Sequence, residues 1–283
     1  MRYQRILLLV ITFLFFPGVM LAHQPRLVEN RLINIEQPDI SKAYYAELQS
    51  EPDVYQINVS VSFDLYLNLL VPDTTNQKTD IVAVLLQENQ GEKSILTVLG
   101  GPDTQWQRYW EKYGRDWYLK GPEYRARLEP GNYQVVVSSE NNNSKYTLAV
   151  GERELFNFKE SVNALRLILK IKRNFFNSSP VSFLLSPLGY GYVLIMLVLA
   201  FIFGFIYRLI MKKVASGKAQ GSAKNINLKD RLLRAFLGIV LLAIALVTTW
   251  NPLLLFFSGF CFFEAIFSWC GFYALIGKNS CPL

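Results

Sequence analysis

Three apolar stretches near the C-terminal end constrain this chain more than any other feature. They cover residues 188–210, 232–250 and 253–276. About 20 helical residues are enough to cross the roughly 30 Å hydrocarbon core of a bilayer, so we expect three transmembrane helices. Only Asn251 and Pro252 separate the last two stretches. The second and third helices must therefore form a tight antiparallel hairpin.

The net charge of +7 belongs to the membrane part of the chain. Residues 24–187 hold 18 Lys and Arg against 20 Asp and Glu. The segment after the first apolar stretch has one acid, Asp230, and the cations Lys212, Lys213, Lys218, Lys224, Lys229, Arg231 and Arg234. Basic loops stay in the cytoplasm, so we place the loop at 211–231 and the tail at 277–283 on that side. This location of the charge indicates membrane topology and argues against nucleic-acid binding.

The first 22 residues have the order of a secretory signal. Arg2 and Arg5 precede an apolar run, and Pro17 and Ala22 follow it. This pattern predicts cleavage after Ala22, with an uncleaved signal anchor as the alternative. Either way, the segment that follows is expected outside the cytoplasm.

Residues 24–151 are typical of an all-β domain. Short apolar runs broken by turn residues predict strands at 54–61, 63–71, 81–86, 133–137 and 146–150. Pro130 to Asn132 supply a turn before the fourth of these runs. We expect an antiparallel β-sandwich outside the cytoplasm, joined to an α-helical membrane domain.

The turn at Leu128, Pro130 and Gly131 is followed by a strand that begins at Tyr133. In this outline residues 125–152 resemble secreted prepeptidase-type β-sandwich modules. The resemblance implies a sandwich fold.

Aromatic residues recur with helical spacing between residues 106 and 117, interleaved with charges. They are Trp106, Tyr109, Trp110, Tyr113 and Trp117. The spacing predicts a short helix that packs one ringed face on the sheet. The alternative is an exposed aromatic face that binds a sugar or a peptide.

Residues 152–187 form a neck between the sandwich and the first apolar stretch. Within it, residues 159–176 fit both a strand and a helix, and the segment is basic in either form. We interpret it as an amphipathic element at the lipid surface; a solvated neck is the alternative.

The sequence offers no enzyme site. His23 is the single histidine, which excludes a Ser-His-Asp or Cys-His site inside the folded domain and the usual zinc sites. The three cysteines, Cys261, Cys270 and Cys281, all lie in the membrane part, so the outer domain has no disulfide. A hydrolase with paired carboxylates needs no histidine, but no spacing selects such a pair. We expect no catalytic residue, metal or cofactor.

The last part of the chain, residues 225–282, resembles the YgaP-like transmembrane hairpin of bacterial inner-membrane proteins. The residues that carry the resemblance are Asn225, Asp230, Arg231, Arg234, Gly238, Cys270, Tyr273, Gly277, Asn279 and Cys281. The sequence has Gly271 and Phe272 after the first cysteine, where the family usually has Pro-Leu. The resemblance implies the bacterial cytoplasmic (inner) membrane, and it carries no rhodanese chemistry because the catalytic cysteine loop is missing.

Two polar pairs stand out in the hairpin. Cys270 and Cys281 lie near the cytoplasmic end of the third stretch, where thiols can handle sulfur or electrons.

Glu264 is a carboxylate deep in an apolar stretch, and such a charge requires a partner. Folding the hairpin about Asn251 brings Glu264 within a turn of Arg234. We therefore predict a contact between Glu264 and Arg234 that acts as a structural clamp.

These observations together favour a membrane-tethered, non-catalytic protein whose sandwich binds a protein or a glycan outside the cytoplasm. The thiol pair is the alternative function. The expected partners are the lipid bilayer, that outer ligand, and a second copy of the chain through the hairpin, but not nucleic acid.

Overall fold

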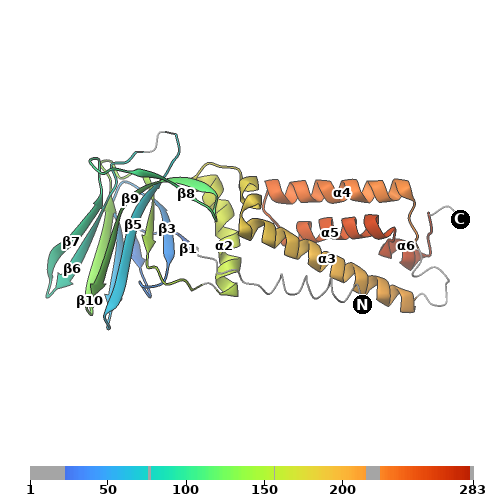
Figure 1. Ribbon diagram of the computed structural model, residues 1–283, viewed down its shortest axis with the longest axis horizontal. Helices are drawn as coiled ribbons and strands as arrows, with labels where there is room; N and C mark the ends of the chain where they lie inside the picture. The colour runs from blue at the N-terminus through green and yellow to red at the C-terminus, as the bar shows by residue number, and fades with distance from the viewer. Residues whose placement is uncertain (1–22, 76–77, 156, 215–223, 281–283) are drawn as a thin grey trace. The chain divides into compact units, whose positions relative to one another are not determined.

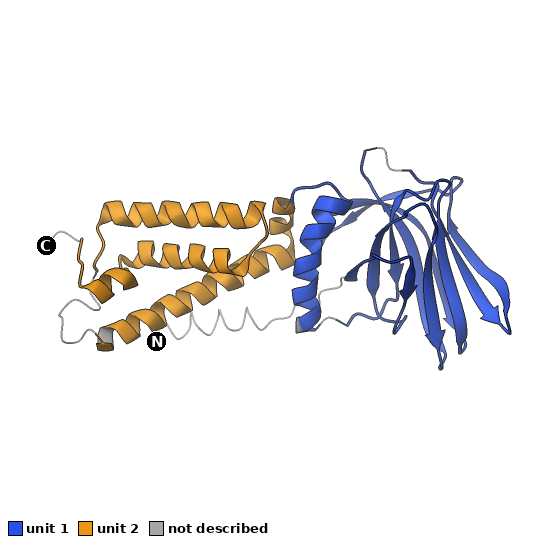
Figure 2. Cartoon of the chain, turned by 180° about the vertical axis from the view of Figure 1, so that it is seen from behind, with its two compact units in different colours: residues 1–179 blue, residues 180–283 orange. Residues whose placement is uncertain are grey.

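The computed structural model describes residues 23–75, 78–155, 157–214 and 224–280. The chain divides into two compact units, Met1–Ser179 and Pro180–Leu283, drawn in blue and orange in Figure 2. The expected signal at 1–22, most of the basic loop and Cys281 lie outside the described residues.

Two β-sheets form the first unit (Figure 1). A six-stranded sheet has the order β1-β3-β11-β5-β9-β8, and a five-stranded sheet has the order β2-β4-β10-β6-β7. The strands of the first sheet are β1 (Gln24–Leu27), β3 (Lys42–Glu47), β5 (Phe63–Pro72), β8 (Gln107–Glu111), β9 (Asp116–Leu128) and β11 (Lys145–Val150). Those of the second are β2 (Leu32–Asn34), β4 (Asp53–Val59), β6 (Val82–Asn89), β7 (Glu92–Gly100) and β10 (Gly131–Ser138). Most neighbours are antiparallel, but the short edge strands β1 and β2 pair in parallel with β3 and β4. The N-terminal unit is therefore β-rich with a sandwich architecture, as the sequence predicts.

Strand β5 corresponds to the strand predicted at 63–71, and it is apolar on both faces because both faces are buried. Leu65, Leu67 and Leu69 belong to the core between the two sheets. Tyr66 and Leu70 point to the other face, where they pack in a second cluster. Because successive side chains alternate in direction, a strand buried on both sides becomes a continuous apolar run.

The second cluster is built by the neck, which folds as a helix. Helix α2 (Phe158–Lys170) continues into a π-helical turn, η1 (Ile171–Phe175). Ile171, Phe175 and Phe176 pack on the outer face of the six-stranded sheet, beside Tyr66 and Tyr118. The helical alternative is therefore the correct one. Part of the apolar face of this segment packs on the sheet, and its place near the lipid surface stays a prediction.

Residues 106–117 are not a helix, which corrects the sequence expectation. They contribute β8, a turn, and the start of β9, which pair antiparallel with Trp110 opposite Trp117. Arg115 in the turn has a φ of 58° and follows Gly114. The spacing of the rings fits a helix, but cross-strand pairing with β9 determines the fold here.

The second unit is helical (Figure 1). A 3₁₀ segment, η2 (Pro180–Leu185), precedes α3 (Pro187–Val214), α4 (Leu228–Val247), α5 (Pro252–Phe267) and α6 (Gly271–Ile276). Helix α4 begins where the Oδ1 atom of Asn227 accepts the N–H of Asp230 at 2.9 Å, the cap expected at this position. Residues 248–251 join α4 to α5, so α4 ends three residues before the expected Trp250, and the connection is still short enough for a tight hairpin. Over Pro187–Met211, α3 is the one described helix that is both long and apolar enough to cross a membrane, and α5 is a shorter apolar helix.

The third apolar stretch is broken, which also corrects the expectation of one continuous helix to residue 276. Helix α5 ends at Ser268, whose φ is 53°, and α6 starts at Gly271. The side chain of Asn225 accepts the N–H of Cys270 at 2.7 Å and donates to its carbonyl oxygen at 2.9 Å. These bonds satisfy backbone groups that a continuous helix would satisfy itself, so the break is stable inside the unit.

Candidate binding site

The β8–β9 hairpin carries a stacked set of arginines and tryptophans. The rings of Trp110 and Trp117 lie 4.9 Å apart between centroids. The guanidinium of Arg108 lies 4.3 Å from the centre of the Trp117 ring, and that of Arg115 lies 5.4 Å from Trp110. We call these four residues the Arg–Trp ladder. Cation–π contacts of this kind contribute about 0.5–1 kcal/mol each at exposed sites, so the ladder holds its own shape.

The ladder lies at the β8 edge of the six-stranded sheet, with Arg108 and Trp117 exposed and Trp110 and Arg115 half-buried. Trp117 retains 41% of its surface, and β8 pairs only with β9 among the described strands. Arg108 is held further by Asp73, whose Oδ2 accepts from Nε at 2.6 Å. The result is an aromatic surface beside a strand edge that pairs with no other described strand.

The five aromatic residues expected on one face are distributed over several environments. Trp110 and Trp117 share the ladder face, whereas Tyr109 lies opposite Tyr118 on the other face of the sheet, where it is also 41% exposed. Trp106 is partly buried against the core between the sheets, and its Nε1 donates to the carbonyl oxygen of Gly101 at 3.3 Å. Tyr113 lies in the turn, 4.9 Å from the ammonium of Lys112. The alternation of a strand, and not the spacing of a helix, selects the two residues that are presented together.

A buried ion pair anchors the hairpin. The Nζ atom of Lys172 lies 2.8 Å and 2.9 Å from the carboxylate oxygens of Asp116, and the Lys172 side chain has no exposed surface. Burial raises the pKa of Asp116, and the ammonium of Lys172 opposes that effect. Burial also raises the pKa of the nearby Glu111, which accepts the N–H of Tyr113 at 2.8 Å. The sequence places Lys172 in a basic segment and gives no sign that its side chain is buried.

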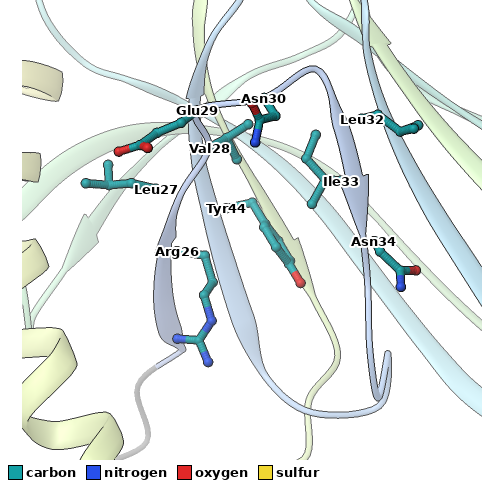
Figure 3. A pocket seen from close by; sticks show the side chains of 9 residues that line it. All are labelled: Arg26, Leu27, Val28, Glu29, Asn30, Leu32, Ile33, Asn34 and Tyr44. Carbon is teal, nitrogen blue, oxygen red and sulfur yellow. The ribbon is translucent and has the colours of Figure 1, made fainter.

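A cleft of about 300 Å³ lies between the edge strands β1 and β2 (Figure 3). It is lined by Arg26, Leu27, Val28, Glu29, Asn30, Leu32, Ile33, Asn34 and Tyr44. In Figure 3 the Tyr44 ring stands between the strand of Arg26 and the strand of Ile33. Burial raises the pKa of Tyr44 to about 12, and the guanidinium of Arg26 pairs with Glu160 at 2.9 Å. No sequence pattern indicated this cleft, because it is formed by residues of three separate strands.

The predicted contact in the hairpin is formed. Arg234 Nε lies 2.9 Å from Glu264 Oε2, and Glu264 Oε1 accepts the N–H of Gly271 at 3.2 Å. One carboxylate thus binds both α4 and the first residue of α6. Its role as a structural clamp stays a prediction.

The thiol pair is not brought together among the described residues. Cys270 is buried and caps α6, and Cys281 lies outside the described part of the chain. Cys261 is half-buried within α5. In the described ranges no group of three or more His, Cys, Asp and Glu side chains is arranged to hold a metal ion.

Comparison with solved structures gives distant similarities for the β-rich unit. The pre-peptidase C-terminal domain of a Bacillus anthracis collagenase is 15% identical over 42% of this chain and 92% of its own, with a TM-score of 0.26. A Yersinia pseudotuberculosis-derived mitogen is 12% identical over 42% of this chain and 92% of its own, with a TM-score of 0.28. Murine APRIL is 14% identical over 38% and 76%, with a TM-score of 0.21. These scores are too low to carry an argument about function.

No curated protein matches the chain. Residues 222–283 match the family described as "Inner membrane protein YgaP-like, transmembrane domain", a segment that contains α4, α5 and α6. The resemblance of the hairpin to this family is thereby confirmed. The chain is therefore a membrane protein that combines a β-rich N-terminal domain with a YgaP-like transmembrane domain.

Proposed function

We propose that this chain is a non-catalytic binding protein of the bacterial cytoplasmic membrane. Its sandwich lies outside the cytoplasm and binds a partner through the Arg–Trp ladder. Three spans, α3, α4 and the broken pair α5 and α6, anchor it. The basic loop at 211–231 and the C-terminal tail lie in the cytoplasm.

The exposed ladder is the observation that carries this proposal. Large rings with Arg neighbours are the side chains that contribute most at binding interfaces. Here Trp110 and Trp117 are pre-ordered by Arg108 and Arg115, so binding loses little conformational entropy.

A protein partner fits the ladder better than a glycan does. Each indole already has a guanidinium over its ring, which reduces the surface on which a sugar can stack. The free backbone of β8 can pair with an extended segment of a partner. A side chain of that segment placed beside Trp110 would lie on the same face as both indoles, because Trp110 and Trp117 are opposite each other across β8 and β9.

The apolar surfaces of the helical unit support the three spans. Large apolar side chains remain exposed on each of the three longer helices, including Phe203 and Ile206 on α3, Leu233 and Phe236 on α4, and Phe257 and Ile266 on α5. A continuous apolar exterior of this kind is stable in lipid and costly in water. The start of α4 carries Lys229 and Arg231. Basic residues at this end of a span are typical of the cytoplasmic side of the membrane.

Site-specific photo-crosslinking in cells tests the binding face. A photoreactive phenylalanine at position 117 should give a discrete adduct, and the W110A substitution should weaken that adduct. The matched control is position 95 on β7, where Ile95 is also exposed, at 65%, but lies on the other sheet. Equal adducts at both positions, or none at position 117, would contradict the assignment of the ladder.

Reporter fusions test the topology separately. Alkaline phosphatase fused after residue 283 should be inactive, and the same enzyme fused after residue 180 should be active. Phosphatase activity at the C-terminus would reverse the proposed orientation.

A further inference from the structure

Helix α2 carries three cations on the side opposite the sheet. They are Lys159, Arg166 and Lys170, and all three are exposed. At about 100° per residue, their spacing places them within a sector of roughly 40°. Ala164 and Ile171, on the other side of the helix, are buried. We call the three cations the basic stripe.

The basic stripe has little local neutralisation. No described carboxylate forms an ion pair with Lys159, Arg166 or Lys170. The acid of this helix, Glu160, is engaged by Arg26 at 2.9 Å. The stripe is therefore a concentrated positive surface that the fold of the unit does not use.

The opposite side of the helix holds it firmly to the sandwich. Phe176 packs edge-on against Tyr118 with ring centroids 5.1 Å apart, and Phe175 packs against Tyr45 at 5.3 Å. The buried pair of Lys172 and Asp116 adds a fixed polar contact. Any surface that binds the stripe therefore also orients the sheet behind it.

The chain between this helix and the first span is short. Ten residues separate Phe176 from Pro187, and Pro180–Leu185 among them form η2. With about 2 Å of rise per 3₁₀ residue and about 3.4 Å per extended residue, the connection reaches no more than about 30 Å. A tether of this length keeps the stripe at a high effective concentration beside the bilayer that α3 enters.

We infer that the basic stripe docks on anionic phospholipid headgroups of this bilayer. The inference rests on the proposed membrane span α3. Clustered cations next to a span bind anionic lipid by charge, and each contributes about fivefold to the docking equilibrium. Docking fixes which way the sandwich faces, so it determines where the Arg–Trp ladder is presented. The apolar side of the helix stays on the sheet and does not enter the lipid.

The test uses the full chain in nanodiscs of neutral phosphatidylcholine, with and without 30% phosphatidylglycerol. Hydrogen exchange of residues 159–173 should be at least threefold slower in the anionic discs, and 0.5 M salt should abolish the difference. The variant R166Q/K170Q should exchange equally in both discs. Its matched control is K93Q/R127Q, which removes the same charge from exposed strand positions and should keep the slowing.

The outcomes separate the two proposals. A chain that does not enter the discs without detergent contradicts the span. A chain that enters them but exchanges equally in both compositions contradicts the docking. Slowing that survives in R166Q/K170Q, or that disappears equally in the control, also contradicts it. Unchanged unfolding midpoints of both variants show that the fold is intact.

Discussion

The ammonium of Lys172 lies 2.8 Å from Asp116 although 56 positions separate the two residues in the sequence. This pair joins the neck to the hairpin that carries the Arg–Trp ladder. Both side chains are buried, so neither can lose its partner without leaving an isolated charge in a dry environment.

Replacing Lys172 with Met should therefore destabilise the β-rich unit by about 3–5 kcal/mol, because Asp116 remains buried and unpaired. Tryptophan fluorescence during chemical unfolding measures the loss. The double variant K172M/D116L should recover much of it. Arg127→Ala, which breaks an exposed pair with Asp64 at 3.3 Å, should cost less than about 1 kcal/mol. Similar losses for K172M and R127A would show that the buried pair has no special role.

The stability of the β-rich unit should also depend on the ionisation of Glu123. Its hydrogen bond from Lys120, with another from Arg125, lowers the pKa of Glu123 from 4.5 to about 2. A carboxyl whose pKa falls on folding stabilises the fold above its unfolded pKa, and this contribution is lost as the pH drops through the folded value. The difference in unfolding free energy between wild type and E123Q should be largest above pH 5 and should shrink between about pH 4.5 and pH 2. A difference that is constant over this range would exclude the proposed linkage.

In the helical unit, Glu264→Gln should lower stability by about 3 kcal/mol, because the charge-assisted bond to Arg234 is lost. Unfolding in mixed detergent micelles measures this effect. Proton flux across vesicles that contain the protein should not change. The double variant R234Q/E264Q should be less unstable than the two single losses added together, since the residues act as one contact. A change in proton flux would indicate a transport role and would overturn the clamp.

Two glycines of α3 provide a matched test of how closely α3 and α5 pack. A Cβ atom at Gly204 would lie 2.5–2.7 Å from ring atoms of Phe263, whereas one at Gly191 would meet nothing within 4 Å. Gly204→Ala should therefore destabilise the unit by about 1–3 kcal/mol through overpacking. Gly191→Ala should be neutral or slightly stabilising, because alanine is the better helix former. Equal effects of the two changes in detergent unfolding would mean that α3 and α5 do not pack closely.

The features that depend on local pattern were predictable from the sequence. The strands around Leu67 and Val135 follow from apolar runs, and the start of α4 follows from Asn227 and Asp230. The contact of Glu264 with Arg234 was also predictable, since a short turn that ends at Asn251 fixes which levels of two helices face each other.

The features that depend on distant partners were not predictable. Trp110 and Trp117 fit helical spacing, and only pairing across the turn at Gly114 assigns them to opposed strand positions. The turn sequence itself, Tyr113 to Asp116, was the available signal. The break at Ser268 was hidden in an apolar run, because the amide that satisfies it belongs to Asn225. The burial of Lys172 gives no local signal, because its partner Asp116 is far away in the sequence.

The bonds of Glu264 have a consequence for biosynthesis. Arg234 is synthesised 30 residues before Glu264, and the N–H of Gly271 is synthesised 7 residues after it. Each charge alone makes its helix costly to release into lipid. The two helices should therefore leave the insertion machinery together, as a neutral pair, once the short helix behind them has emerged.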